Sequence, residues 1–197
     1  MNNNKYNMFQ NMDNYGYLEI IIGPMFSGKT TKILNIYNQC KFCNIGVMVI
    51  NHCLDKRYDE ELLSSHDKIK IPCNQMTLLS EIFNDLNFSN YINSNVILIN
   101  EAQFFPDLEE SVKKMLFNNK QIYISGLDGD FEQKKFGQIL DLIPLCDKVT
   151  KYKSLCGSCK NGTSAIFSKR ISFEKEQTVI GSNNYIPVCR NCFNKKN

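Results

Sequence analysis

One short segment of the chain places glycines, a lysine and a threonine directly after an apolar run. Residues 23–30 read GPMFSGKT, which fits the pattern GxxxxGK[ST]. Residues 17–22 before it are apolar and β-branched, and residues 29–43 after it carry apolar side chains at helical spacing. A glycine-rich turn between a strand and a helix wraps backbone N–H groups around an anion at the positive helix end. This context predicts a phosphate-binding loop.

The rest of the chain alternates between apolar runs and helical patterns. We expect strands at residues 17–22, 46–51, 96–100 and 121–125, and helices at residues 29–43 and 77–86. We expect a third helix that begins with Pro106 at its first position and continues through residues 107–117. Residues 52–72 are polar and read as a long loop. Continuous apolar strands that alternate with helices predict an α/β fold whose parallel sheet has helices on both faces.

The phosphate loop needs specific partners for phosphoryl chemistry. Lys29 would neutralise the β- and γ-phosphates of ATP, and Thr30 would ligate Mg²⁺. Loops of this kind use an acidic residue at the end of a neighbouring core strand. Here the strand at 96–100 ends in Asn100, at the usual Mg²⁺-side aspartate position, and Glu101 follows. Because successive strand side chains point apart, we expect Glu101 to face the substrate.

Charge divides the chain into two parts. Residues 1–147 carry 13 Lys and Arg against 18 Asp and Glu, whereas residues 148–197 carry 10 against 2. We therefore expect a tail at 1–15, Asn-rich and disordered, an ATP-binding α/β domain at 16–147 and a separate basic module at 148–197. No apolar run is long enough to span a membrane, and no signal-peptide pattern opens the chain, so we expect a cytoplasmic protein.

Two cysteine pairs lie in the basic module. Cys156 and Cys159 form one CxxC pair, and Cys189 and Cys192 form the second. Four thiolates at this spacing suit tetrahedral Zn²⁺ with no open position, which predicts a structural zinc site. Cys40 and Cys43 also match one CxxC pair, but they lie on a predicted helix without a second pair and are read as packing residues.

These motifs together resemble the thymidine kinase 1-like (type II) cellular and viral thymidine kinases. The matching segments are GPMFSGKT at 23–30, DKRY at 55–58, SHD at 65–67, NEAQFFPD at 100–107, LDGDFEQKKFG at 127–137, the two cysteine pairs, residues 179–181, and YIPVCRNC at 185–192. They occur in family order and span about residues 16–193.

The resemblance implies a fold, an activity and a set of site residues. It implies a P-loop domain with a C-terminal zinc-ribbon module whose lasso loop closes over a nucleoside. The implied activity is Mg²⁺-dependent transfer of the ATP γ-phosphate to the 5′-hydroxyl of deoxythymidine, and of deoxyuridine as well. The implied role is nucleotide salvage for DNA synthesis, and the implied oligomer is usually a homotetramer. Glu101 matches the general base. ATP and Mg²⁺ binding is implied for Gly23, Pro24, Met25, Phe26, Ser27, Gly28, Lys29, Thr30, Asp55, Lys56, Arg57, Asn100 and Gln103. Nucleoside binding is implied for Phe104, Leu127, Phe131, Ser168, Gln177, Thr178, Val179, Ile180, Gly181 and Tyr185.

The sequence departs from the family pattern at three places. Asn100 replaces the usual aspartate before the catalytic glutamate. The lasso between Gly181 and Tyr185 is one residue short. The stretch after Cys159 is about two residues longer than in the family, and Ser168 stands where the family more often has threonine. The first departure bears on Mg²⁺ binding and turnover, and the other two on substrate range.

Two other functions fit parts of the sequence. A P-loop ATPase with a nucleic-acid-binding zinc ribbon would explain the basic module, although its basic residues do not form a run with interleaved aromatics. A non-catalytic kinase homologue would explain Asn100 alone. We expect deoxythymidine and ATP as ligands, and neither a membrane nor a nucleic acid as partner.

Overall fold

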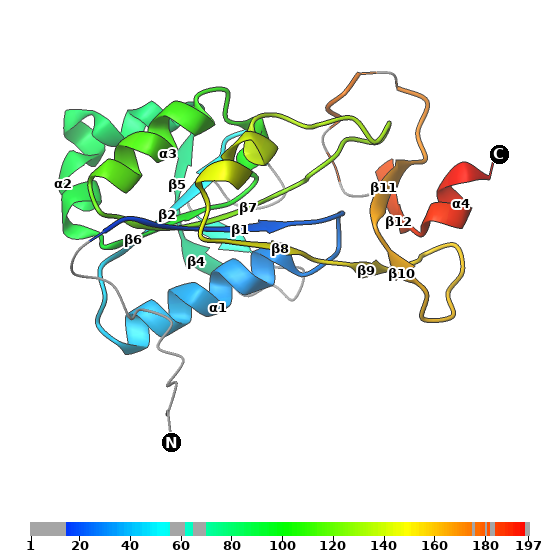
Figure 1. Cartoon of the computed structure of the whole chain (residues 1–197), viewed down its shortest axis with the longest axis horizontal. Helices are drawn as coiled ribbons and strands as arrows, with labels where there is room; N and C mark the ends of the chain where they lie inside the picture. Colours follow the sequence, from blue (N-terminus) through cyan, green and yellow to red (C-terminus); the bar gives the residue numbers. More distant parts are fainter. Residues whose placement is uncertain are drawn as a thin grey trace.

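The fold is built around the apolar strands that the sequence predicts. The computed structural model describes residues 15–55, 62–64, 70–174, 176–179, 181 and 184–195. Its large sheet contains six strands: β1 (Tyr17–Ile22), β2 (Val47–His52), β5 (Asn74–Met76), β6 (Val96–Ile99), β7 (Gln121–Gly126) and β8 (Lys148–Lys151). They lie in the order β5-β2-β6-β7-β1-β8, and all neighbours pair in parallel (Figure 1). The predicted parallel α/β sheet is confirmed.

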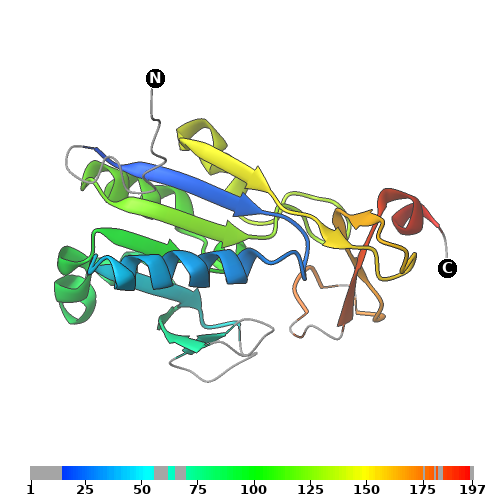
Figure 2. The same ribbon diagram turned by 90° about the horizontal axis from the view of Figure 1, so that it is seen from below.

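Helices cover both faces of this sheet, as predicted. Helix α1 (Lys29–Phe42) lies on one face, and α2 (Asp85–Asn93) and α3 (Leu108–Phe117) lie on the other (Figures 1 and 2). Successive strand side chains point to opposite faces, so Ile20 packs with the α3 side and Ile21 with the α1 side. No described helix is both long and apolar enough to cross a bilayer.

The predicted helix at residues 77–86 is wrong in its bounds. A 3₁₀-helix, η1 (Leu79–Phe83), is followed by α2, and Asn84 between them is extended with ψ 153°. The Glu81 carboxylate accepts hydrogen bonds from the N–H groups of Thr77 and Leu78, which fixes the first turn. Helix α2 continues to Asn93 despite several asparagines because Tyr91 is buried, so packing outweighs the weak helix propensity.

Pro106 does not occupy the first helical position that we predicted. Helix α3 begins at Leu108, with Asp107 as its N-cap. The Asp107 carboxylate instead accepts hydrogen bonds from the N–H groups of Leu79 and Ser80, at 2.9 and 2.8 Å. It therefore joins η1 to α3.

The polar stretch at residues 52–72 is not a loop throughout. Its described parts include an antiparallel pair, β3 (Leu62–Ser64) and β4 (Lys70–Pro72). Leu63 and Ile71 are buried in the apolar cluster beneath α1, which holds this pair against the domain.

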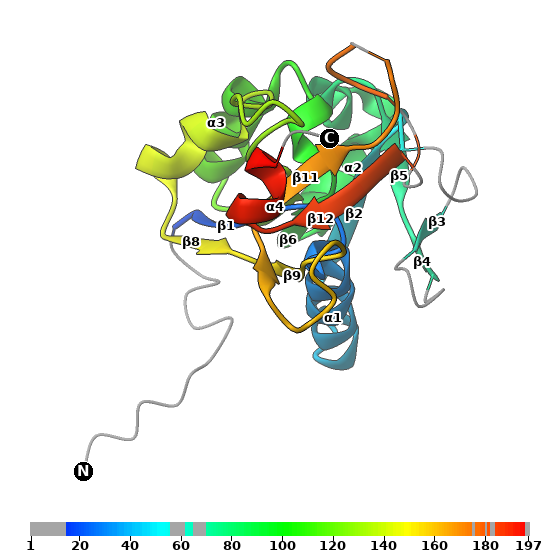
Figure 3. The ribbon, with the colours of Figure 1, turned by 90° about the vertical axis from the view of Figure 1, so that its right-hand side faces the viewer.

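The C-terminal part leaves the sheet and forms two small ribbons beside its end (Figure 3). After η3 (Ile139–Leu145) and β8, strands β9 (Ser154–Leu155) and β10 (Ser164–Ala165) pair with each other, as do β11 (Phe167–Arg170) and β12 (Tyr185–Val188). The short helix α4 (Arg190–Asn194) follows. The charge change at Asp147 lies one residue before β8, a strand of the large sheet.

Candidate active site and cysteine cluster

The predicted phosphate loop joins the carboxyl end of β1 to the amino end of α1 (Figure 2). Gly23 and Gly28 have φ values of +146° and +86°, which favour glycine. A Cβ at Gly23 would lie 2.5 Å from the carbonyl oxygen of Tyr152, so no side chain fits there. A Cβ at Gly28 would meet no described atom within 4 Å, and this glycine lines an open cavity.

The side chains of the loop fit a polyphosphate. The buried Lys29 ammonium donates to the carbonyl oxygen of Pro24 at 2.7 Å, which holds its charge beside the loop. The Ser27 hydroxyl is buried and has no hydrogen-bond partner among the described residues. Helix α1 adds the N–H groups of its amino end, and Thr30 adds a hydroxyl oxygen of the kind that Mg²⁺ accepts. The loop therefore has both anion-binding donors and a ligand for the metal.

A buried amide occupies the position of the predicted acidic partner. Asn100, 2% exposed, accepts hydrogen bonds from the hydroxyls of Ser125 at 2.7 Å and Thr30 at 3.4 Å. Its amide nitrogen donates to Asn51 at 2.9 Å, and the Asn51 amide donates to Asp55 at 3.4 Å. The network joins Thr30 to Asp55 through two neutral amides. Asp55 is therefore the carboxylate that this network connects to the phosphate loop.

Glu101 follows β6 in a left-handed conformation, with φ +51°, and begins the 3₁₀-turn η2 (Ala102–Phe104). The Gln103 amide donates to its carboxylate at 2.7 Å, and the N–H of Leu127 donates to the Gln103 oxygen at 2.9 Å. A Cβ at Gly126 would approach that oxygen to 2.5 Å, so glycine leaves room for this bridge. Gln103 thus ties the Glu101 carboxylate to the end of β7.

One cavity, open to solvent, is lined by both the phosphate loop and Glu101. Sequence-predicted residues on its wall are Met25, Phe26, Ser27, Gly28, Lys29, Thr30, Asp55, Glu101, Gln103, Phe104, Leu127, Phe131, Ser168, Gln177, Thr178, Val179, Gly181 and Tyr185. Gly23, Pro24 and Asn100 do not line this wall, but each lies next to a residue that does: Ser27, Lys29 and Thr30 respectively. Lys56, Arg57 and Ile180 lie outside the described residues, as do residues 1–14 of the predicted tail.

Aromatic rings line part of the cavity wall. The Phe104 ring lies 5.5 Å from that of Phe136 and 5.6 Å from that of His52, between ring centroids. Burial lowers the pKa of His52, and its ring nitrogen accepts a hydrogen bond from the N–H of Leu54. A neutral imidazole therefore packs against Phe104, and the perpendicular rings of Phe104 and Phe136 give that side of the cavity an apolar wall.

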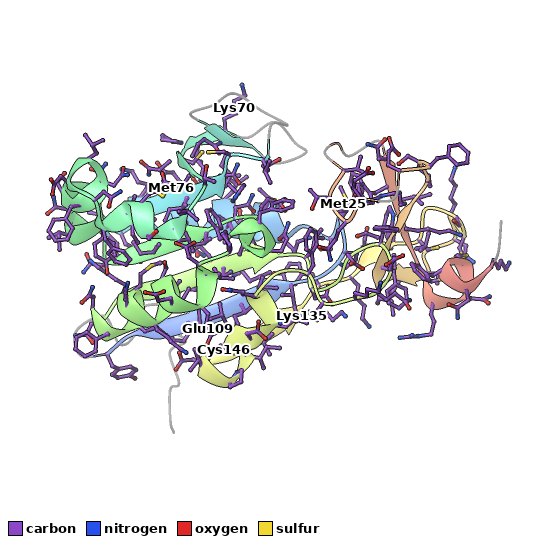
Figure 4. All side chains as sticks on the ribbon, turned by 90° about the horizontal axis from the view of Figure 1, so that it is seen from above. Met25, Lys70, Met76, Glu109, Lys135 and Cys146 are labelled. Carbon is purple, nitrogen blue, oxygen red and sulfur yellow. The ribbon has the colours of Figure 1, made fainter. Side chains whose placement is uncertain are left out.

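The C-terminal ribbons contact the phosphate loop directly. The N–H of Met25 donates to the Ser168 hydroxyl at 2.9 Å, and the Ser154 hydroxyl donates to the carbonyl oxygen of Phe26 at 3.0 Å. Figure 4 shows Met25 between the sheet and the ribbons. Ser168 therefore touches the backbone of the phosphate loop as well as lining the cavity.

The four predicted zinc ligands lie together. The sulfur atoms of Cys156, Cys159, Cys189 and Cys192 are all within 4.8 Å of one another. Hydrogen bonds from the N–H groups of Cys159 and Cys189 lower the pKa of the Cys156 thiol to about 6, which favours the thiolate that a metal needs. The donor set fits a closed tetrahedral Zn²⁺ site. By contrast Cys40 lies on the buried face of α1, so its packing interpretation is confirmed, whereas Cys43 follows the helix and is exposed, so the same interpretation is wrong for Cys43.

Comparison with known proteins gives one family across almost the whole described chain. The thymidine kinase family model matches residues 16–193. The chain belongs to the thymidine kinase family. It is 40% identical over 183 residues to the thymidine kinase of Yaba monkey tumor virus, which covers 92% of this chain and 97% of the viral protein. It is 34% identical over 182 residues to the cytosolic thymidine kinase of Gallus gallus, covering 92% of this chain and 78% of that one.

Solved structures add less. Domain III of the Thermotoga maritima replication initiation protein DnaA aligns with a TM-score of 0.41 and 16% identity, over 71% of this chain and 55% of that one. At this similarity the likeness carries nothing about activity. Membership of the thymidine kinase family rests on the sequence relationships.

Several residues of this thymidine kinase family member escaped the sequence analysis. Asn51 and Ser125 complete the Asn100 network, and Asp130 and Phe136 line or back the cavity. The available signal was position: the carboxyl ends of parallel strands meet at one edge of a sheet, where ligands bind. Asp130 and Phe136 also lie inside the segment 127–137 that carries the family resemblance. Arg170 had no such signal.

Proposed function

We propose that this chain is an ATP-dependent thymidine kinase that transfers the γ-phosphate to the 5′-hydroxyl of deoxythymidine, and of deoxyuridine, and so gives the nucleoside monophosphate. The observation that carries the proposal is the single cavity that contains the phosphate loop, Glu101 and an aromatic wall. A nucleoside on the aromatic side would bring its hydroxyl between Glu101 and the bound phosphates. Family membership and the names of the viral and avian relatives support the same substrate.

The reaction needs one proton transfer and one phosphoryl transfer. The Glu101 carboxylate accepts the proton of the 5′-hydroxyl while that oxygen attacks the γ-phosphorus. The bond from the γ-phosphorus to the bridging oxygen breaks, and ADP leaves. Gln103 holds the carboxylate in place through its 2.7 Å hydrogen bond. Such positioning supplies much of the rate in phosphoryl transfer, because the transition state asks little covalent chemistry of the protein.

Charge compensation comes from the phosphate side of the cavity. Lys29 and the amino end of α1 stabilise the negative charge on the transferred group. Thr30 and Asp55 are the residues that would hold Mg²⁺, and Asn51 and Asn100 connect them. The ion would neutralise phosphate charge when bound. Arg57 joins this group as a phosphate ligand in the proposal.

The setting of the enzyme belongs to the same proposal. We propose that it acts in the cytoplasm in nucleotide salvage, as a homotetramer, with a structural Zn²⁺ held by the four cysteines. One relative, from Gallus gallus, is described as cytosolic. The close approach of the four sulfurs supports the zinc site.

The proposal is tested by transfer of label from γ-labelled ATP to deoxythymidine in the presence of Mg²⁺. Wild-type protein should form labelled dTMP, and Glu101→Gln should lower kcat about 10²- to 10⁴-fold while it keeps nucleoside binding, because the change removes the base and little volume. Glu110→Gln, on an exposed position of α3, is the matched control and should leave kcat unchanged. Near-normal turnover of Glu101→Gln would remove Glu101 from the mechanism.

A further inference from the structure

Arg170 is the last residue of β11 and is almost completely buried, with 8% of its surface exposed. Its guanidinium group donates to three backbone carbonyl oxygens that follow it in the chain. Those of Glu174 and Gln177 lie at 3.1 and 3.0 Å, and that of Glu176 is a third partner. The group also donates to the hydroxyl of Tyr185. One side chain thus binds three backbone carbonyl groups of the segment that follows β11.

The same guanidinium group stacks on aromatic rings from two different parts of the chain. Its central carbon lies 3.7 Å from the centroid of the Phe131 ring and 5.1 Å from that of Tyr185. Phe131 belongs to the segment after β7, and Tyr185 opens β12. A planar cation can stack on rings and donate in its own plane at the same time, which an ammonium group cannot do. Arg170 therefore connects three segments that line the cavity.

A second set of contacts holds the loop from the other side. The Gln177 amide donates to the Asp130 carboxylate at 2.8 Å. Asp130 is itself fixed, because its other oxygen accepts from the N–H groups of Glu132 and Lys134, both at 2.9 Å. The Tyr185 hydroxyl accepts from the N–H of Val179 and donates to its carbonyl oxygen. Arg170 therefore binds the same segment that carries Gln177 and Val179 on the cavity wall. Contacts from both sides fix this segment in place.

We propose that Arg170 is the positioning residue that preforms the nucleoside-binding wall at residues 177–179. It does not line the cavity among the described residues, so it acts through the loop backbone and through Tyr185 and Phe131. With Arg170 in place the wall exists before the nucleoside arrives, and binding does not have to order it. This inference rests on the proposed function for the identity of the nucleoside.

Removing Arg170 should therefore weaken nucleoside binding far more than ATP binding. Where only a fraction of molecules holds the competent wall, apparent affinity falls by that fraction, and a population of about 1–10% gives a 10- to 100-fold loss. We expect Arg170→Ala to raise the KM for deoxythymidine about 10- to 100-fold. The KM for ATP should stay within about twofold, because the phosphate loop makes no contact with Arg170 among the described residues.

Two further variants make the test specific. Arg170→Lys keeps the positive charge but loses the stacking and most of the donors, so it should raise the KM for deoxythymidine about 5- to 30-fold. Arg190→Ala is the matched control, because Arg190 also stacks on a ring, that of Phe167 at 5.1 Å, but lies on α4 and is exposed. It should leave both KM values unchanged. If Arg170→Ala does not fold, Arg170→Lys carries the test.

Hydrogen exchange gives a readout that does not depend on activity. Amide exchange in the peptide containing residues 177–179 should be faster in Arg170→Ala than in wild type, with exchange in β1 and β7 unchanged. Inactive wild-type protein with this exchange difference would refute the thymidine kinase proposal and leave the role of Arg170 standing. Unchanged exchange and unchanged KM for deoxythymidine would overturn the role of Arg170, and so would equal rises in both KM values.

Discussion

The two sides of the cavity are held in place by different means. The phosphate side belongs to a sheet whose two faces bury twenty and eleven of the described residues in continuous apolar clusters. The C-terminal ribbons bury four residues in their own cluster, and two of these are predicted zinc ligands. So small an apolar core cannot fold a module of this size, and a metal site is the usual remedy. The ribbon side of the cavity, to which Ser168 and Tyr185 belong, therefore depends in our proposal on bound Zn²⁺ and on local contacts.

The difference in apolar burial predicts which structural changes remain confined to the ribbons. A disturbance of the ribbons reaches the phosphate loop through hydrogen bonds at Ser168 and Ser154 and through the N–H of Tyr152, which donates to Ile22 at 2.7 Å. Among the residues that the structure describes, the apolar clusters under α1 and α3 contain none from the ribbons. We therefore expect the sheet to tolerate loss of the ribbons better than the ribbons tolerate loss of zinc.

Removal of zinc should produce the largest difference between the two sides of the cavity. Structural zinc contributes about 10 kcal/mol to the folding of small zinc modules at neutral pH. Chelation, or Cys189→Ser, should therefore unfold the ribbons and abolish deoxythymidine binding, while the main thermal transition of the sheet persists and ATP affinity falls by no more than about tenfold. Calorimetric titration with each ligand, together with a thermal scan, measures the three quantities.

Cys43→Ser is the matched control for this prediction. Cys43 belongs to the other CxxC pair, directly follows α1 and is exposed. Its substitution should change neither the zinc content nor ligand binding. Zinc-free protein that still binds deoxythymidine normally would show that the ribbons fold without the metal. The contrast between the two sides of the cavity would then be wrong.

The same contrast separates what the sequence could predict from what it could not. The phosphate loop, the core strands and the zinc ligands are local in sequence, and each has a pattern whose physical cause is known. The bounds of α2 were missed because burial of Tyr91 outweighs local propensity. Arg170 was missed because its partners, Phe131 and Tyr185, approach it only in three dimensions.

Asn100→Asp should have a smaller effect than loss of zinc, and it tests the metal-binding part of the phosphate side. A carboxylate beside Thr30 adds negative charge near the expected metal, so the Mg²⁺ concentration for half-maximal rate should fall about tenfold, or about 1.4 kcal/mol. The Asn51 amide would have to turn to donate to it and would lose its bond to Asp55. We therefore expect Tm to fall by about 2–4 °C for each kcal/mol by which the lost hydrogen bond lowers the free energy of unfolding.

Steady-state rates against Mg²⁺ concentration and a thermal scan check both parts of this prediction. Asn90→Asp adds the same charge on an exposed position of α2 and should change neither value. An unchanged or higher Mg²⁺ requirement in Asn100→Asp would mean that position 100 does not limit metal binding. The neutral Asn51–Asn100 pair would then have no role in the phosphate site.

The most direct measurement is a nucleoside panel with γ-labelled ATP and Mg²⁺. Deoxythymidine, deoxyuridine, deoxycytidine and deoxyadenosine run in parallel with a lane that holds DNA and no nucleoside. Labelled dTMP, with little product from deoxycytidine or deoxyadenosine, is the predicted result. No labelled nucleotide from folded, zinc-loaded protein would contradict it. Phosphate release only with DNA would then indicate a nucleic-acid ATPase, and silence in every lane a non-catalytic homologue.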